Sequence, residues 1–353
     1  MRMVMMLRPA VRGIHGAALV GCIFVLFVVA EAAARDAETV YVEGFPELRS
    51  TGGQLGDLFF GDRVRSGETV ITGRADTAEL ELDDGNSVVV QQDTVFTLQE
   101  IDEDGESRPA YSNSRGAVTY RIDAIRGRNP RIQSANAVVG VRGTTFTVFA
   151  GDDGSSLFLV EEGRIAVQAR GEEVELGPDF AVEVRAGEAP GEPFEVLRGE
   201  IDFSGWNNGR TAAILENPVA AAEGAYRRLE ELVAEMQAAV AEWEPVSAEL
   251  RDARARASEI FQEEGQEAAN EFREENVRPL ERIAPRRYLN VRYWALSALN
   301  MRRYVFGRMY TILRSSYFME PRHPDFVAYR EVHERVLDLI GSEVADYLVA
   351  ADY

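Results

Sequence analysis

The sequence contains no lysine and is poor in the residues that carry most enzymatic chemistry. All 38 of its basic residues are arginines, and the 353 residues include one cysteine and three histidines. Without lysine, Schiff-base catalysis and lysine-dependent phosphate loops are excluded. Because Cys22 is the single cysteine, an intramolecular disulfide is excluded as well.

The histidines and acidic loops give no catalytic, cofactor or metal site. His333 begins an HERVL stretch in which Leu337 stands where an HExxH zinc site needs its second histidine. The acidic stretches 102–106 and 152–153 could bind calcium loosely, but the glycine of the first comes too early for an EF-hand, and we favour solvated loops. We therefore predict a non-enzymatic protein without a cofactor.

Acidic residues outnumber basic ones, 59 to 38, which gives a formal charge of −21. Such a surface repels nucleic acid and anionic lipid, so neither is an expected partner.

The first 34 residues are predicted to be a signal peptide. Arg2, Arg8 and Arg12 precede an apolar run at 17–30, and Ala32-Ala33-Ala34 fits a cleavage site. An uncleaved anchor and lipidation at Cys22 remain alternatives. We expect an exported protein of the periplasm or cell envelope.

The segment 35–203 shows the pattern of an all-β domain. Ala78, Leu80 and Leu82 alternate with acidic residues, and Asp-Gly, Glu-Gly and Arg-Gly turns recur at roughly ten-residue spacing. A similar skeleton of glycine, valine or leucine, and aspartate occurs at 85–98 and 171–184, which favours a repeating unit. Residues 99–115 are acidic and polar and are predicted to be an exposed loop.

The most apolar β-branched stretch, 137–150, is predicted to turn a corner. Val139 and Val141 share one strand parity and Phe146 and Val148 the other, so the inward face changes sides at Arg142-Gly143. We assign Arg142, Gly143, Thr144 and Phe146 to this structural corner and claim no ligand contact for them.

Several motifs together resemble the FecR domain over roughly 57–184. Its most distinctive element is Gly-x-Arg-Gly-Thr-x-Phe, here residues 140–146, and the other matching stretches are Gly61-Asp62-x-Val64, Val70-x-Thr72-Gly73, Ala78-x-Leu80-x-Leu82-x-Asp84-Gly85-x-Ser87-x-Val89 and Val160-x-Glu162-Gly163-x-Ile165-x-Val167. The resemblance implies a periplasmic β-solenoid or β-roll. In the family's best-known members this domain senses an outer-membrane TonB-dependent transporter and signals to a sigma factor. Only 16 residues precede the apolar run here, too few for a folded sigma-binding segment, so we expect an exported FecR-like module.

After a predicted linker at 204–213, the hydrophobic period changes to that of helices. We expect an all-α bundle or coiled-coil hairpin of about four helices at 214–353, with Pro245 ending the first helix. Apolar residues at alternating steps of three and four form a heptad seam that should pack against a helix of this chain or of a second copy: Val219, Ala222, Tyr226, Leu229, Val233, Met236, Val240 and Trp243.

The expected third helix, 286–319, combines arginines with aromatic residues and contains no acidic residue. This composition could bind a polyanion, but we favour pairing with the glutamates of 249–275.

We predict a non-enzymatic envelope protein whose FecR-like β domain recognises another envelope protein, with possible homo-oligomerisation through the seam. The alternatives are a peptidoglycan- or polysaccharide-associated scaffold, which Trp206 with Asn207 and Asn208 would suit, and a transmembrane sigma-factor regulator.

Overall fold

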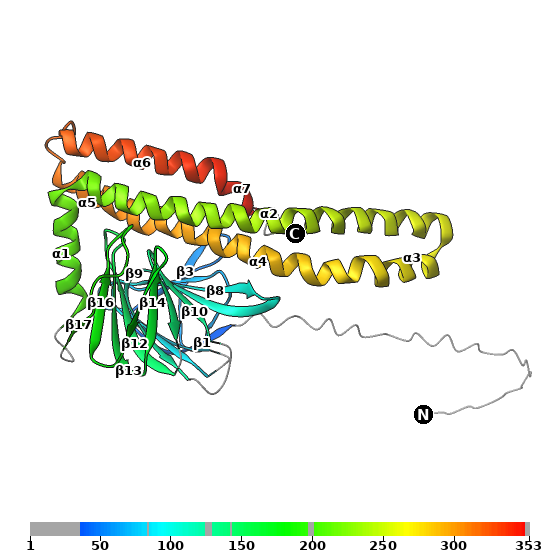
Figure 1. Ribbon diagram of the computed structural model, residues 1–353, viewed down its shortest axis with the longest axis horizontal. Coiled ribbons are helices and arrows are strands. Elements are labelled where there is room, and N and C mark those ends of the chain that lie inside the picture. Colours follow the sequence, from blue (N-terminus) through cyan, green and yellow to red (C-terminus); the bar gives the residue numbers. More distant parts are fainter. Residues whose placement is uncertain (1–35, 83–84, 124–128, 142, 197–200, 350–353) are drawn as a thin grey trace, which may run out of the picture. The chain divides into compact units, whose positions relative to one another are not determined.

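The computed structural model describes residues 36–82, 85–123, 129–141, 143–196 and 201–349. The predicted signal peptide and Arg142 lie outside the described residues. The described residues belong to one compact unit, in which a β part is followed by helices (Figure 1).

The strands of the β part follow one another with short turns. They are β1 (Ala37–Glu43), β2 (Glu47–Arg49), β3 (Leu55–Asp57), β4 (Arg63–Val64), β5 (Thr69–Ile71), β6 (Thr77–Leu82), β7 (Ser87–Val90), β8 (Val95–Glu103), β9 (Glu106–Ile122), β10 (Arg131–Ser134), β11 (Val138–Val141), β12 (Thr144–Ala150), β13 (Ser156–Glu162), β14 (Ile165–Ala169), β15 (Glu172–Leu176), β16 (Phe180–Val184) and β17 (Phe194–Glu195).

The helices are α1 (Phe203–Glu216), α2 (Pro218–Glu264), α3 (Gln266–Phe272), α4 (Arg278–Asn300), α5 (Gly307–Ser316), α6 (Pro324–Glu343) and α7 (Ala345–Val349). Two π-helical segments, η1 (Arg273–Val277) and η2 (Met301–Phe306), continue α3 into α4 and α4 into α5. None of the helices in the described ranges combines the length and apolarity that a bilayer crossing requires.

The strands form two layers that share β9. The first layer has the order β4-β1-β6-β7-β9-β12-β13-β16-β17, and the second has the order β3-β2-β5-β8-β9-β10-β11-β14-β15. Inward side chains of both layers meet in one core that includes Leu80, Phe96, Ile132 and Phe158. The alternating pattern of β6 matches this arrangement, since its inward Ala78 and Leu80 are fully buried.

The chain passes between the layers at residues with positive φ. Gly116, at φ 88°, divides β9 into a half that pairs with β8 and a half that pairs with β12. Asp93 and Asp179, at φ 53° and 64°, stand at equivalent crossings after β7 and β15. The repeated skeleton of the sequence therefore corresponds to a hairpin followed by a strand in the opposite layer.

A β-solenoid is not confirmed. Stacked solenoid coils pair in parallel, whereas every described strand pair is antiparallel except β9 with β10.

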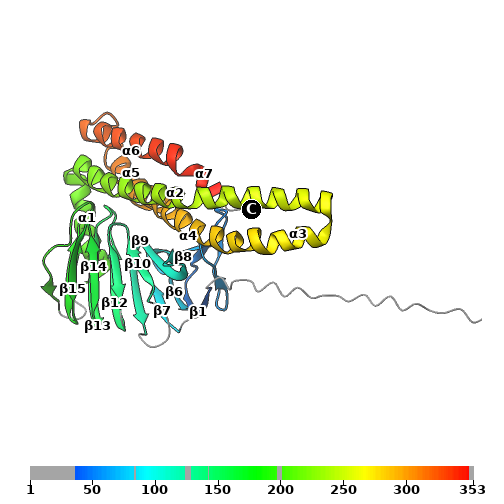
Figure 2. The same ribbon diagram turned by 45° about the vertical axis from the view of Figure 1, so that its right-hand side comes forward.

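The helices have a second core, to which the heptad seam contributes. Ala222, Leu229 and Met236 are fully buried, and Tyr226, Val233 and Val240 nearly so, whereas Val219 and Trp243 are half-buried at the two ends of the seam. This face of α2 packs against α4 and α6 of the same chain (Figure 2).

Three local predictions were wrong. Pro245 does not end its helix, because α2 continues to Glu264 with an antiparallel neighbour along its length. The segment predicted as a linker, 204–213, lies inside α1. The Asp202 side chain caps this helix by accepting a hydrogen bond from the Gly205 backbone N–H, and Trp206 packs on Phe149. The predicted loop 99–115 forms the hairpin of β8 and β9, and its polar Gln99 and Asn113 are buried.

Candidate protein-docking groove

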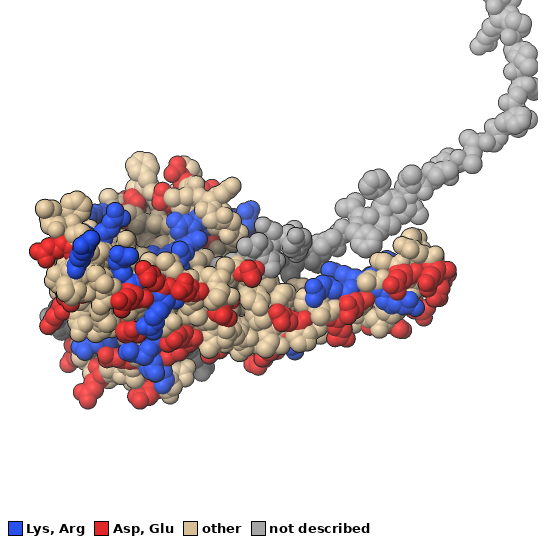
Figure 3. Space-filling model, turned by 90° about the horizontal axis from the view of Figure 1, so that it is seen from above, with Lys and Arg blue, Asp and Glu red and all other residues tan. Residues whose placement is uncertain are grey.

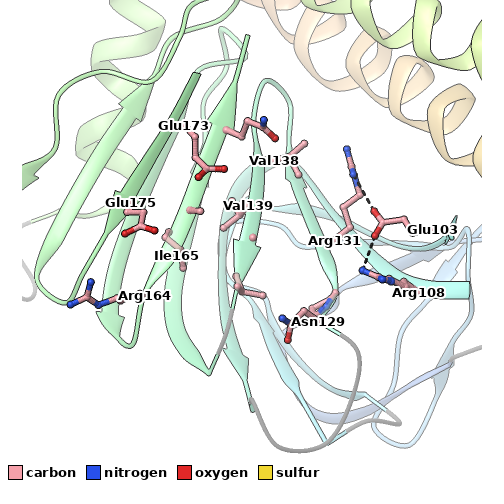
Figure 4. A pocket seen from close by; sticks show the side chains of 15 residues that line it. Glu103, Arg108, Asn129, Arg131, Val138, Val139, Arg164, Ile165, Glu173 and Glu175 are labelled. Carbon is pink, nitrogen blue, oxygen red and sulfur yellow. Dashed lines mark hydrogen bonds and ion pairs between the residues drawn. The ribbon is translucent and has the colours of Figure 1, made fainter. Parts of the chain in front are cut away.

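An open groove of about 470 Å³ crosses the outer face of the second layer (Figure 4). Its floor consists of the outward residues of two adjacent strands, Val138 and Gly140 on β11 and Ala166 and Gln168 on β14. Strand alternation explains why these four residues form the floor, because the intervening Val139 and Val167 point into the core. The lack of a side chain at Gly140 and the small side chain of Ala166 leave room above the sheet.

Arginines line one side of the groove. Arg108 and Arg131 share the carboxylate of Glu103, at 2.9 and 3.2 Å (Figure 4). Arg131 also lies over the rings of Tyr293 and Trp294 of α4. Burial tends to lower the pKa of Arg131, but Tyr293 and Glu103 outweigh it and the pKa is raised. These contacts hold the wall in place and neutralise part of its charge.

Glutamates line the opposite side. Glu173 and Glu175 project from β15, opposite Gln168 and Ala166, and neither forms an ion pair with the described residues. Among the described strands, β15 pairs with β14 alone, so it is an edge of the second layer. Exposed charges on an edge strand oppose unspecific strand pairing.

The predicted corner residues lie at the end of the groove floor. Gly143, at φ 61°, follows β11 and begins the passage into β12 of the other layer. A Cβ at Gly163 would overlap the Gly143 carbonyl, and the Thr144 hydroxyl donates to the Arg164 carbonyl at 2.9 Å. Phe146 is fully buried and stacks on Tyr120 with ring centroids 5.1 Å apart. The described corner residues therefore hold the layers together beneath the groove.

The arginines of 286–314 do not pair with the acidic helix, contrary to prediction. Arg286 donates to the Gly105 carbonyl, Arg287 to the Glu242 carbonyl and Arg292 to the Ser66 carbonyl, at 2.7–2.8 Å. The acidic segment pairs with arginines close to it in the chain, as in Arg256–Glu259 and Arg278–Glu274. Backbone carbonyls are acceptors that no charge pattern reveals, so the sequence could not have shown these contacts.

The two acidic stretches serve as anchors for the helices. The backbone of Asp102 exchanges two hydrogen bonds with the Asn290 side chain of α4, at 2.8 and 3.0 Å. Asp152 is fully buried between Arg115 and Arg308, at 3.0 and 3.1 Å. The solvated-loop prediction was therefore wrong for Asp152 and Asp153, which are buried, whereas residues 104–106 are exposed at a turn. Within the described ranges, no three His, Cys, Asp or Glu side chains are grouped to hold a metal ion.

Trp206 and Asn207 make contacts within the chain. The Trp206 indole donates to Glu183 at 3.2 Å, and the Asn207 side-chain oxygen accepts from the Asp152 backbone at 2.9 Å. Both residues tie α1 to the β part.

Residues 68–166 match the family model described as FecR protein. This stretch is a FecR domain, as the motifs predicted, and it contains most of the groove floor and its arginine side. No curated protein matches the chain.

Two solved structures from Parabacteroides distasonis ATCC 8503, at 1.65 and 2.50 Å resolution, are similar to this chain, and both are described as a "putative anti-sigma factor". Each is 17% identical and covers 36% of this chain, with TM-scores of 0.32 and 0.31. The alignments span 59% of the length of those proteins.

Proposed function

We propose that this protein is a non-enzymatic, exported binding protein that uses the groove of its FecR domain to hold an extended, basic segment of another envelope protein. The groove supports this proposal through its unequal charges. Glu103 compensates Arg108 and Arg131 on one side, whereas Glu173 and Glu175 form no ion pair with the described residues, although Arg164 also lines the groove.

The partner would lie along β15 as an added strand. Backbone hydrogen bonds to the free edge of β15 would provide affinity, and basic side chains facing Glu173 and Glu175 would provide specificity.

Cross-linking in intact cells tests the groove. A photoreactive residue replacing the exposed Gln168 should capture one protein, and the double change Glu173→Arg and Glu175→Arg should abolish that capture. Glu81→Arg is the matched control, because Glu81 is exposed on β6 of the other layer. Equal loss of capture in the control would show a general charge effect and contradict the groove as the binding site.

A FecR-type regulator is the second candidate, and the family match favours it. The two functions predict different fates for the N-terminal segment, which is cleaved in one and retained in the other. A mature protein that begins at Arg35, identified by mass spectrometry of the periplasmic fraction, would favour the exported binding protein. A full-length chain in the inner membrane would favour the regulator.

A further inference from the structure

A second cavity, of about 310 Å³, lies between the β2–β3 turn and the helices and is lined by arginines alone among charged residues. Arg49 comes from β2, Arg292 from α4, and Arg302 and Arg303 from η2. This concentration of positive charge is unexpected in a chain whose acidic residues outnumber its basic residues.

Two of the four arginines are held in place by neutral groups. Arg292 donates to the Ser66 carbonyl at 2.8 Å, and the lack of a side chain at Gly67 permits this path, since a Cβ there would overlap the guanidinium. Arg49 donates to the Tyr304 hydroxyl and lies 5.8 Å from the centre of its ring. Neither contact neutralises a positive charge.

The other two arginines, Arg302 and Arg303, have no hydrogen bond or ion pair with the described residues. They are adjacent in η2, where the wider π-helical turn rotates successive side chains by a smaller angle than an α-helix does. Both side chains line the cavity.

The charges around the cavity favour the binding of an anion. Burial, together with the charges of Arg49 and Arg302, lowers the pKa of Arg303. Burial also lowers the pKa of Arg292, opposed by Tyr288 and by Glu100, whose carboxylate does not line the cavity. Like charges held together in this way cost free energy unless an anion joins them.

We propose that this arginine pocket binds a small, multiply charged oxyanion of the phosphate-ester class. Guanidinium groups match phosphate oxygens with paired, charge-assisted hydrogen bonds, which four arginines can supply from several sides. Leu296, Leu299 and Ile340 form an apolar wall that receives the organic part of the ester. The pocket is separate from the groove, so it binds whether or not the groove holds a protein.

Isothermal titration of the whole protein with phenyl phosphate and with inorganic pyrophosphate, at low ionic strength, tests the proposal. Both probes should bind, and the double change Arg302→Gln and Arg303→Gln should weaken binding at least about tenfold. Arg314→Gln is the matched control, because Arg314 is an exposed arginine of α5 outside the pocket.

Folding does not confound this test. The double variant should be at least as stable as the parent in urea, because it relieves repulsion between like charges. Equal binding by the parent and the double variant would overturn the proposal.

The residues after Val349 provide a last control, since Asp352 follows the pocket-lining Tyr347 in the chain and carries a carboxylate. A chain shortened at Val349 should bind the probes as the parent does. Binding by the shortened chain alone would show that the chain's own carboxylates compete for the pocket, and would overturn a free ester as the occupant.

Discussion

The long hairpin of α2 and α4 has an inner and an outer region, which differ in how deeply their apolar and charged side chains are buried. Its inner region, 218–244 with its partners, packs large side chains such as Leu229 and Met236 against α4 and α6 and is anchored on the β part. Its outer region, 245–285, which we call the arm, extends away from the strands (Figures 1 and 2). The arm has a small core of its own that includes Leu250 and Ala257.

The ion pairs of the two regions also differ in burial. Ion pairs of the arm, such as Arg254–Glu281, are exposed on its surface, where acidic and basic side chains alternate (Figure 3). At the anchored end, Asp152 is fully buried between two arginines. Exposed pairs contribute little to stability, whereas a buried charge depends on its partners. The comparison therefore predicts that stability resides at the anchored end.

The largest effect is expected from Asp152→Asn. The variant keeps the shape of the side chain but leaves Arg115 and Arg308 facing a neutral amide at a buried position. Loss of one partner from a buried charge cluster costs about 3–5 kcal/mol. Urea unfolding monitored by circular dichroism measures the change. A loss below about 1 kcal/mol would mean that the buried network does not anchor the helices.

Leu229→Ala compares the cores of the two regions. Leu229 is fully buried in the inner region, and its truncation should cost about 2–5 kcal/mol in the free energy of unfolding. Leu250→Ala, in the arm, is the matched truncation and should mainly speed local opening. Hydrogen exchange followed by mass spectrometry separates the two: Leu229→Ala should raise exchange throughout the helices, and Leu250→Ala only within 245–285. The same pattern for both variants would contradict the comparison.

Pro245→Ala acts where the two regions meet. Proline inside a helix removes one hydrogen bond and disfavours the preceding turn, at a cost of up to about 3 kcal/mol, and Pro245 is exposed within α2. The substitution should slow hydrogen exchange around 241–249 and raise the midpoint of thermal unfolding. Faster exchange there would show that Pro245 stabilises the junction in the folded chain.

The β part was largely predictable because its signals are local. The alternation of Ala78, Leu80 and Leu82 needs only a buried face and a wet face. The turns at Asp104-Gly105 and Arg170-Gly171 are signalled by Asp104 and the two glycines, which tolerate the positive φ that all four residues adopt. The parity change across Gly143 matches the passage between layers.

Contacts between distant segments were not predictable. The polar 99–115 segment reads as a loop, yet it folds into a hairpin whose Asp102 pairs with Asn290, far along the chain. Pro245 and the glycines of α1 are exposed, yet they follow helix geometry because the helices that contain them pack on other elements, which a local propensity does not contain. The groove combines residues from β8 through β15, and only its floor motif was visible in the sequence.

The smallest effect is expected from Glu281→Gln in the arm, and it sharpens the comparison most directly. Glu281 accepts two hydrogen bonds from Arg254, at 2.8 and 3.2 Å, so the geometry is as favourable as that of the Asp152 contacts. Both partners are exposed, however, and water compensates for the lost pair. The free energy of unfolding should change by at most about 1 kcal/mol, and less at high salt. A loss comparable with that of Asp152→Asn would show that burial is not what separates the two regions.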